Sequence, residues 1–411
     1  MYDRQAVQGK IARYRFPSFY LQMNRNVLIL AFCQAMMFSG IGLVLSSSAL
    51  IGKSLATNPA WATLPLALQY MTTMLVIFYV SSLMKIKGRR YVFVRGALLG
   101  ATGLLLATLG IWLQNFMLFA LSSLLIGIHT AIGQFYRFAA AEAVSSELKA
   151  KAISLTLAGG VLAAFIGPNL AIYTKNLLEY VFLASYLTLV LVNILVAWIS
   201  SRLELPPIPE DNEEIRPLLA IATQPKYILA LVAAMIGYGV MNFLMTATPL
   251  AMHNHDHSFA STATVIQWHL FAMFAPSFFT GDLIRKFGVM QMMILGCLLL
   301  MSCALINLNG TTLFHFETAL ILLGIGWNFL YIGATTLLTE TYSSNERSKA
   351  QGLNDTFVFA TLTTTSLASG ALEAAFGWQA INLYSLPPIL FVCLGLVWLV
   401  GKSKKQIVVT S

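Results

Sequence analysis

The chain alternates long apolar runs with short polar turns along almost all of its 411 residues. Twelve such runs, each about 20 residues long, form two sets of six. The first set covers residues 27–52, 61–84, 92–112, 116–141, 152–173 and 180–200. The second set covers residues 227–252, 261–284, 289–308, 315–339, 351–372 and 379–400. Each run is long enough to cross a hydrocarbon core of roughly 30 Å as an α-helix, so the pattern predicts an all-α membrane protein with twelve transmembrane helices.

A repeated turn divides these runs into two equivalent halves. The segment EAVSSELKAKA at residues 142–152 returns without a gap as ETYSSNERSKA at residues 340–350. Such a repeat predicts two pseudo-symmetric six-helix bundles. Between them, residues 201–226 contain PPIPEDNEEIRP and are expected to form a linker. The expected domains are an N-terminal segment 1–26, a bundle 27–200, the linker 201–226, a bundle 227–400 and a tail 401–411.

Composition and charge support a lipid environment. Hydrophobic residues make up 58% of the chain, charged residues 10%, and the mean hydropathy is +0.75, which leaves too little polar surface for a water-soluble globule. The net charge of +9 comes from lysines and arginines that gather on one side of the predicted membrane, with only Lys53 and Lys175 on the other. By the positive-inside rule, this placement predicts that both termini are cytoplasmic. The excess of basic residues therefore indicates membrane orientation and not nucleic-acid binding.

Several function classes are excluded or disfavoured by absent motifs. The four cysteines all lie in apolar runs, so a disulfide framework is not expected. There is no nucleophile elbow, phosphate-binding glycine loop or zinc-protease helix, which argues against an enzyme and against an ATP-driven pump. We therefore expect no cofactor and no nucleic-acid partner.

The repeated turns resemble those of the major facilitator superfamily. In that family an acid, a few small residues, a second acid and two bracketing basic residues follow the fourth and tenth helices. The matching positions here are Glu142, Glu147, Lys149, Lys151 and Ala152 in the first half, and Glu340, Glu346, Arg347, Lys349, Ala350 and Gly352 in the second. The resemblance implies a secondary transporter with a central path between two bundles, located as a monomer in a bacterial inner membrane with both termini cytoplasmic.

The family's signature turn after the second helix is also similar, with one departure in each half. The matching positions are Ser81, Leu83, Lys85, Gly88, Arg89 and Arg90, and their echo is Gly281, Leu283, Arg285, Lys286 and Gly288. Lys85 and Arg285 stand where the family has an aspartate. We therefore expect a cytoplasmic gate of reversed polarity, in which Lys85 faces Asp355 or Glu340 and Arg285 faces Glu142 or Glu147. Ordinary solvated positive-inside charges are the alternative.

Two intramembrane histidines and an arginine are candidates for the solute or proton path. His129 stands where proton-coupled exporters of the family have an arginine, and helical spacing places it on one stripe with Arg137. His269 follows Gln267 and Trp268 on the eighth run. Charges in a membrane are costly, so Arg137 should face a cavity or a partner, or else reach the cytoplasmic surface. Each histidine is either a proton site or a packed, hydrogen-bonded side chain.

The resemblance further implies that the first, fourth, seventh and tenth helices line the path. Polar and aromatic residues on those runs are Gln34, Tyr238, Asn242, Trp327, Asn328 and Tyr331. Aromatic walls with a few amides suit a partly apolar organic solute, although each residue alone could equally pack the bundle. His253, His255 and His257 form a weak metal candidate on the outer face, where a solvated loop is the alternative.

These observations predict alternating-access transport of a small organic solute, coupled to protons as the family implies. Gly159, Gly160, Gly167 and Pro168 on the fifth run partly match the pattern of exporters, which favours export over uptake. Close helix packing explains the same residues. The alternatives are uptake of a small anion or chelated metal, and a receptor or scaffold that binds without transport.

Overall fold

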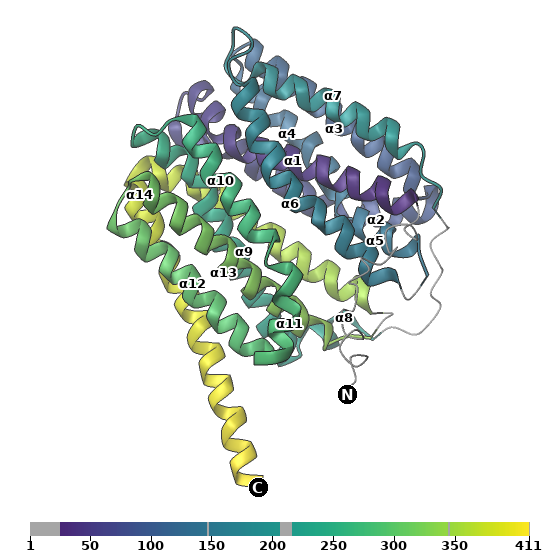
Figure 1. Ribbon diagram of the computed structural model, residues 1–411, viewed down its shortest axis with the longest axis vertical. Coiled ribbons are helices and arrows are strands. Elements are labelled where there is room, and N and C mark those ends of the chain that lie inside the picture. Colours follow the sequence, from purple (N-terminus) through teal and green to yellow (C-terminus); the bar gives the residue numbers. More distant parts are fainter. Residues whose placement is uncertain (1–24, 146–147, 206–215, 344–345, 411) are drawn as a thin grey trace, which may run out of the picture.

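The computed structural model describes residues 25–145, 148–205, 216–343 and 346–410, and every regular element in these ranges is a helix (Figure 1). The N-terminal half contains α1 (Arg25–Leu55), the short 3-10 helix η2 (Pro59–Trp61), α2 (Leu64–Lys87), α3 (Arg89–Trp112), α4 (Phe116–Gly133), α5 (Tyr136–Glu142), α6 (Lys149–Thr174) and α7 (Leu183–Ser200). The C-terminal half contains α8 (Leu218–Ala222), α9 (Pro225–Asn254), α10 (Phe259–Phe274), α11 (Ser277–Phe287), α12 (Val289–Asn309), α13 (Leu313–Thr339) and α14 (Arg347–Thr410).

The helices cross the membrane twelve times, as the apolar runs predict. Ten helical segments of the described residues are by themselves long and apolar enough to span it. One of them, α14, bends at Gly377, where φ is 74°, and so contributes two crossings. The remaining crossing is made by α10 and α11 together, which are separated by a break at Pro276. A proline breaks a helix because it removes one backbone donor and its ring crowds the preceding turn.

Glycines end the second crossing of each half, as their place in the signature turn suggests. Gly88 lies between α2 and α3 with φ of 80°, and Gly288 lies between α11 and α12 with φ of 94°. A side chain is disfavoured at positive φ, so glycine is the residue that allows each chain reversal without a connecting loop.

The two halves lie side by side, and each packs its helices in the same order (Figure 1). In the N-terminal half α1 packs along α6, and in the C-terminal half α9 packs along α14. Contacts between the halves join α2 to α14 and α6 to α10. We call the end of the molecule at which α1 begins the terminal end, and the end at which α1 finishes the opposite end.

The segment between the halves includes a short helix. The expected linker 201–226 contains α8, and its residues 206–215 lie outside the described residues, as do residues 1–24 and Glu147. Arg216 attaches the linker to the C-terminal half. Its Nε and Nη2 atoms donate to the carboxylate of Glu346 at 2.5 and 2.6 Å. The expected tail at 401–411 continues α14 as a helix to Thr410.

Candidate functional site

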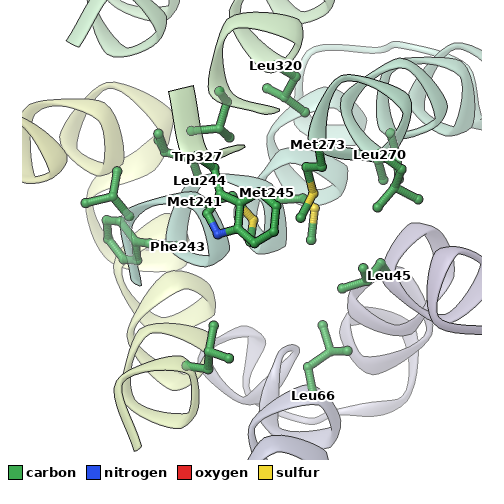
Figure 2. Close-up of a cluster of buried hydrophobic side chains, with 14 of the residues drawn as sticks. Leu45, Leu66, Met241, Phe243, Leu244, Met245, Leu270, Met273, Leu320 and Trp327 are labelled. Atoms are coloured by element: carbon green, nitrogen blue, oxygen red, sulfur yellow. The ribbon is translucent and has the colours of Figure 1, made fainter. Parts of the chain in front are cut away.

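A cavity of about 110 Å³ lies between the two halves, near the middle of the helices. Its walls are mostly apolar. Figure 2 shows part of them, with Leu45 of α1 on one side and Met241 and Met245 of α9 and Leu270 and Met273 of α10 on the other. Lining residues from the N-terminal half include Phe38, Leu45, Tyr70, Thr130, Gln134 and Arg137. Those from the C-terminal half include Tyr238, Met241, Met245, Met273, Phe274, Tyr331 and Asp355.

Three aromatic rings form one wall of this cavity. Trp327 and Tyr331 are four residues apart on α13, which places them on one helix face, and their rings stack with centroids 5.1 Å apart. Tyr238 of α9 meets both rings edge-on at 5.0 Å. Such edge-to-face and stacked pairs hold each ring in a fixed orientation. Tyr238 and Tyr331 therefore present a rigid aromatic surface to the cavity, with Trp327 buried behind them.

The only charged side chains among the described lining residues are Arg137 and Asp355, one from each half. Arg137 lies on α5, just after the break that separates α5 from α4, and its guanidinium stacks over the Phe138 ring at 4.8 Å. Asp355 accepts a hydrogen bond from Asn354 Nδ2 at 3.2 Å. The two charges interact electrostatically, although they form no ion pair within 4 Å. Of the positions left open for Arg137 by the sequence, the structure places it at the wall of a cavity.

Among the described residues the expected pairs of the reversed gate are not formed, and three of the residues have other partners. Glu147, the other acid expected opposite Arg285, lies outside the described residues. Glu142 accepts a hydrogen bond from Arg89 Nη2 at 2.6 Å, and Glu340 accepts one from Lys226 Nζ at 2.8 Å. Arg285 pairs with Asp282 one helical turn earlier. The expected pairing of Arg285 with Glu142 was therefore wrong, because partners within the same half lie closer.

Asp355 was also assigned wrongly to a pair with Lys85. Asp355 lies about two turns inside α14, on the face that points into the cavity, whereas Lys85 is exposed in the last turn of α2. An ionisable residue inside an apolar run is by default a functional candidate, and position 355 in the run 351–372 could have been selected on that ground.

The histidines on the predicted path lie inside each half instead of facing the cavity. His129 is buried between α4 and α3, where its Nδ1 lies 3.2 Å from the Gly96 carbonyl. His269 is buried between α10 and α13, where its Nδ1 lies 2.8 Å from the Leu320 carbonyl. The expected stripe from His129 to Arg137 is wrong, because the helix breaks after Gly133 and turns Arg137 to a different face.

The amides on the predicted path also make structural contacts. Gln267 accepts a hydrogen bond from Asn169 Nδ2 at 2.6 Å, which ties α10 to α6 across the two halves. Asn242 donates to Ser366 on α14 at 2.9 Å. Asn328 donates to the Met273 carbonyl at 2.7 Å and so stabilises the break between α10 and α11. Gln34 is buried in α1 and is not among the cavity residues.

The outer histidines do not converge on one point. His255 Nδ1 lies 2.8 Å from the Ala251 carbonyl, and His257 Nε2 lies 2.7 Å from the Thr311 carbonyl. Within the described ranges, no three histidine, cysteine, aspartate or glutamate side chains are grouped as metal ligands would be. The weak metal candidate of His253, His255 and His257 therefore gains no geometric support.

At the opposite end, a chain of hydrogen bonds joins the two halves. Lys53 Nζ at the end of α1 donates to Asn254 Oδ1 at 2.5 Å, and Asn254 Nδ2 donates to Glu373 Oε1 at 3.2 Å. At the terminal end, the ion pairs of the described residues all lie within one half or join the linker to the C-terminal half. Polar contacts across the halves are thus strongest at the opposite end.

The fold and cavity agree with what sequence comparison finds. The family model described as the Major Facilitator Superfamily matches residues 27–330 and 270–410. The chain belongs to the Major Facilitator Superfamily. Its function is accordingly secondary transport across a membrane, and it is a multi-pass membrane protein and not an enzyme.

The relatives include one with a named solute. The chain is 39% identical to the riboflavin transporter RfnT of Brucella anthropi over 379 residues, which cover 91% of this chain and 95% of the relative. It is 25% identical to the uncharacterized MFS-type transporter YddS of Bacillus subtilis, with 85% of this chain and 84% of the relative covered.

Solved structures confirm the superfamily fold. The nucleoside transporter NupG superposes with a TM-score of 0.70 at 13% identity, covering 91% of this chain and 98% of that one. The human organic anion transporter MFSD10 superposes with a TM-score of 0.68 at 13% identity, covering 90% of this chain and 98% of that one.

Proposed function

We propose that this transporter carries riboflavin, or a solute with a similar fused aromatic ring, by alternating access. The observation that carries the proposal is the 39% identity to the riboflavin transporter RfnT over 91% of this chain. The cavity supports it, because Tyr238 and Tyr331 offer rigid ring faces and edges to a flat aromatic solute. Arg137 and Asp355 supply a donor and an acceptor for the polar edge of such a ring.

The described conformer must open before it binds such a solute. Small-molecule sites usually have volumes of roughly 300–1,000 Å³. The central cavity, at about 110 Å³, is smaller than that range. The halves would therefore separate at one end to admit the solute and at the other to release it, as alternating access requires.

We propose uptake as the direction, in place of the export that the glycines of the fifth run favoured. Gly159 and Gly167 of α6 lie against the backbone of α1, and Gly160 lies against the Phe274 ring, so helix packing accounts for these glycines. A second cavity, of about 570 Å³, opens at the opposite end, where it would receive solute from outside the cell.

This direction assumes that the terminal end is cytoplasmic in a bacterial inner membrane, with the protein as a monomer. The support is the charge pattern: among the described residues, Lys53 and Lys175 are the only lysines or arginines at the opposite end. Ser258→Cys at that end should react with an impermeant maleimide in intact cells, whereas Lys87→Cys should react only after permeabilisation. The native cysteines are all buried and give a low background. The reverse labelling pattern would invert the topology.

Proton coupling is also proposed, with Asp355 as the proton carrier in place of the two histidines. Asp355 is the only carboxylate among the described cavity residues, and protonation would remove its attraction to Arg137. A solute that contacts either group could therefore alter proton binding at the other.

Flux measurements in proteoliposomes test the proposed function. We expect accumulation of labelled riboflavin when the outside is made acidic, and little accumulation when the gradient is collapsed. Riboflavin binding without flux would instead support the receptor or scaffold alternative. Flux of a small anion or a chelated metal in the absence of riboflavin flux would support the other transport alternative.

A further inference from the structure

A second and larger cavity, of about 570 Å³, opens at the opposite end of the molecule between the two halves. We call it the outer vestibule. Its walls come from the last turns of α1 and α3, the connection between α6 and α7, and the connection between α9 and α10. Its volume lies within the range typical of small-molecule sites. It is separate from the central cavity, because none of its lining residues is shared with that cavity.

The charge of the outer vestibule is unusual for this end of the protein. Lys53 and Lys175, the only lysines or arginines of the described chain at the opposite end, both line it. Neither forms an ion pair with a described carboxylate. The other titratable lining groups are Glu179, which is exposed, Tyr180, and the imidazoles of His253 and His257. Two ammonium groups and one carboxylate line the vestibule, and Lys53 is also linked to Glu373 through Asn254. Lys175 has no such link among the described residues and is the ammonium group that faces the cavity most freely.

Aromatic rings stand beside the ammonium groups. Lys175 Nζ lies 4.9 Å from the centre of the Phe259 ring and 5.7 Å from that of Phe182. The two rings, one from each half, meet edge-to-face at 4.9 Å. These contacts hold the Lys175 ammonium at the cavity wall and leave its remaining donor hydrogens for a ligand.

The backbone at Phe182 gives a second and independent sign of a functional site. Phe182 has φ of 68° and ψ of −2°, a left-handed conformation that a bulky side chain rarely adopts. Its N–H donates to the Lys175 carbonyl at 2.8 Å, and its side chain is buried. Strained residues of this kind persist where the surrounding structure holds them, and they cluster at ligand clamps.

We propose that the outer vestibule binds a small organic anion that carries an aromatic ring. The anionic group contacts the ammonium groups of Lys53 and Lys175, and the ring packs against Phe182, Phe259 and Tyr180. Lys53, Lys175 and Phe182 belong to the N-terminal half and Phe259 to the C-terminal half, so the complete site exists only while the halves are together at this end. A bound anion therefore favours that conformer over one that is open there.

Binding of riboflavin 5′-phosphate to the purified full-length protein in a neutral detergent tests the proposal. This probe carries an aromatic ring and a phosphate, and its fluorescence reports binding. For Lys175→Gln we expect Kd to rise about 10-fold, because a charge-assisted contact is lost. Lys53→Gln should raise Kd in the same direction. Binding to the unmodified protein should weaken as salt is added, because exposed charges are screened.

Lys286→Gln is the matched control. Lys286 lies at the terminal end, and its Nζ sits 5.1 Å from the centre of the Phe287 ring, so this variant removes the same charge and a similar ring contact. Its Kd should stay within about two-fold of the unmodified protein, below the effect expected for one charged contact. Equal Kd values in the Lys175→Gln, Lys53→Gln and Lys286→Gln variants would overturn the proposal.

Neutral riboflavin, titrated in parallel, separates this proposal from the proposed function. Its affinity should be unchanged by Lys175→Gln, because the variant leaves the central cavity intact. An equal loss of affinity for riboflavin and its phosphate would contradict an anion site. Failure of riboflavin itself to bind would contradict the proposed function. The anion site would still be supported or contradicted by the Kd values of the three lysine variants for riboflavin 5′-phosphate.

Discussion

At the scale of single residues, Arg137 and Asp355 give the central cavity its charge. They come from different halves and face a space whose other described walls are apolar, aromatic or neutral polar. A charge in such surroundings is costly unless an opposite charge lies nearby, so each residue is tolerated because the other is present.

A double-mutant cycle measures this dependence. Arg137→Gln and Asp355→Asn should each abolish riboflavin accumulation and lower thermal stability, since each leaves one charge of the apolar cavity without its opposite charge. The double variant should be more stable than the sum of the two losses predicts, by about 0.5–3 kcal/mol, as measured by unfolding of the purified protein.

The exposed pair of Arg285 and Asp282 is the control for this cycle. Their side chains are 81% and 69% exposed, and they lie one turn apart on α11. A solvated pair of this kind contributes about 0.3–0.5 kcal/mol. If the cavity pair shows no more coupling than this surface pair, then Arg137 and Asp355 act independently.

At the scale of helices, the glycines of α6 set its distance from α1. A Cβ atom on Gly167 would lie 2.3 Å from the Ser39 carbonyl oxygen, which belongs to the backbone and has little freedom to move. The sequence pattern of these glycines favours export. Close packing of α6 against α1 explains them whatever the direction of transport.

Gly167→Ala should therefore destabilise the N-terminal half. Overpacking of a well-packed interior typically costs about 1–3 kcal/mol, and we expect a lower melting temperature and reduced transport in both directions. Gly395→Ala is the matched control, because a Cβ atom there meets no atom within 4 Å. Normal stability with altered transport direction in Gly167→Ala would favour the exporter interpretation.

Contact between the linker and the start of α14 should depend on pH. The Arg216 guanidinium and the Ser343 N–H both donate to Glu346, and they lower the pKa of Glu346 from 4.5 to about 2. A lowered pKa means that this contact stabilises the fold above the ordinary glutamate pKa, and that the stabilisation is lost as pH falls through the lower value.

Comparison of the unmodified protein with Glu346→Gln isolates this effect. The variant should melt at a lower temperature near neutral pH, and the difference should shrink between about pH 4.5 and pH 2. Thermal unfolding across that range is the measurement. A difference that is constant with pH would show that the carboxylate charge is not what anchors the linker.

At the scale of the whole molecule, periodic features could be read from the sequence. Run length and lipid thickness together fix the crossings, and the glycines at 88 and 288 mark chain reversals that only glycine makes without strain. The superfamily likeness of the repeated turns agrees with the family that the chain belongs to. These features depend on the hydrophobicity and residue type of each segment by itself, and both can be read from the sequence.

The position of the site could be read only in part. Whether a residue faces the cavity depends on which neighbour covers each helix face, and the sequence does not state this. Tyr238, Tyr331 and Arg137 line the cavity as expected, whereas His129 and His269 bond to carbonyls within their own halves. Asp355 was assigned to the gate, although an ionisable residue inside the apolar run 351–372 is itself a candidate for a cavity position.

The most direct test of the account is whether riboflavin binds at the aromatic wall of the central cavity. The measurement is quenching of riboflavin fluorescence by the purified protein, compared between Tyr331→Ala and Tyr384→Ala. Tyr384 is 50% exposed on the outer surface and serves as the matched control. We expect Tyr331→Ala to raise Kd about 10-fold through loss of a stacking partner, and Tyr384→Ala to leave it unchanged. Equal affinities in the two variants, or no riboflavin binding by the unmodified protein, would contradict the account.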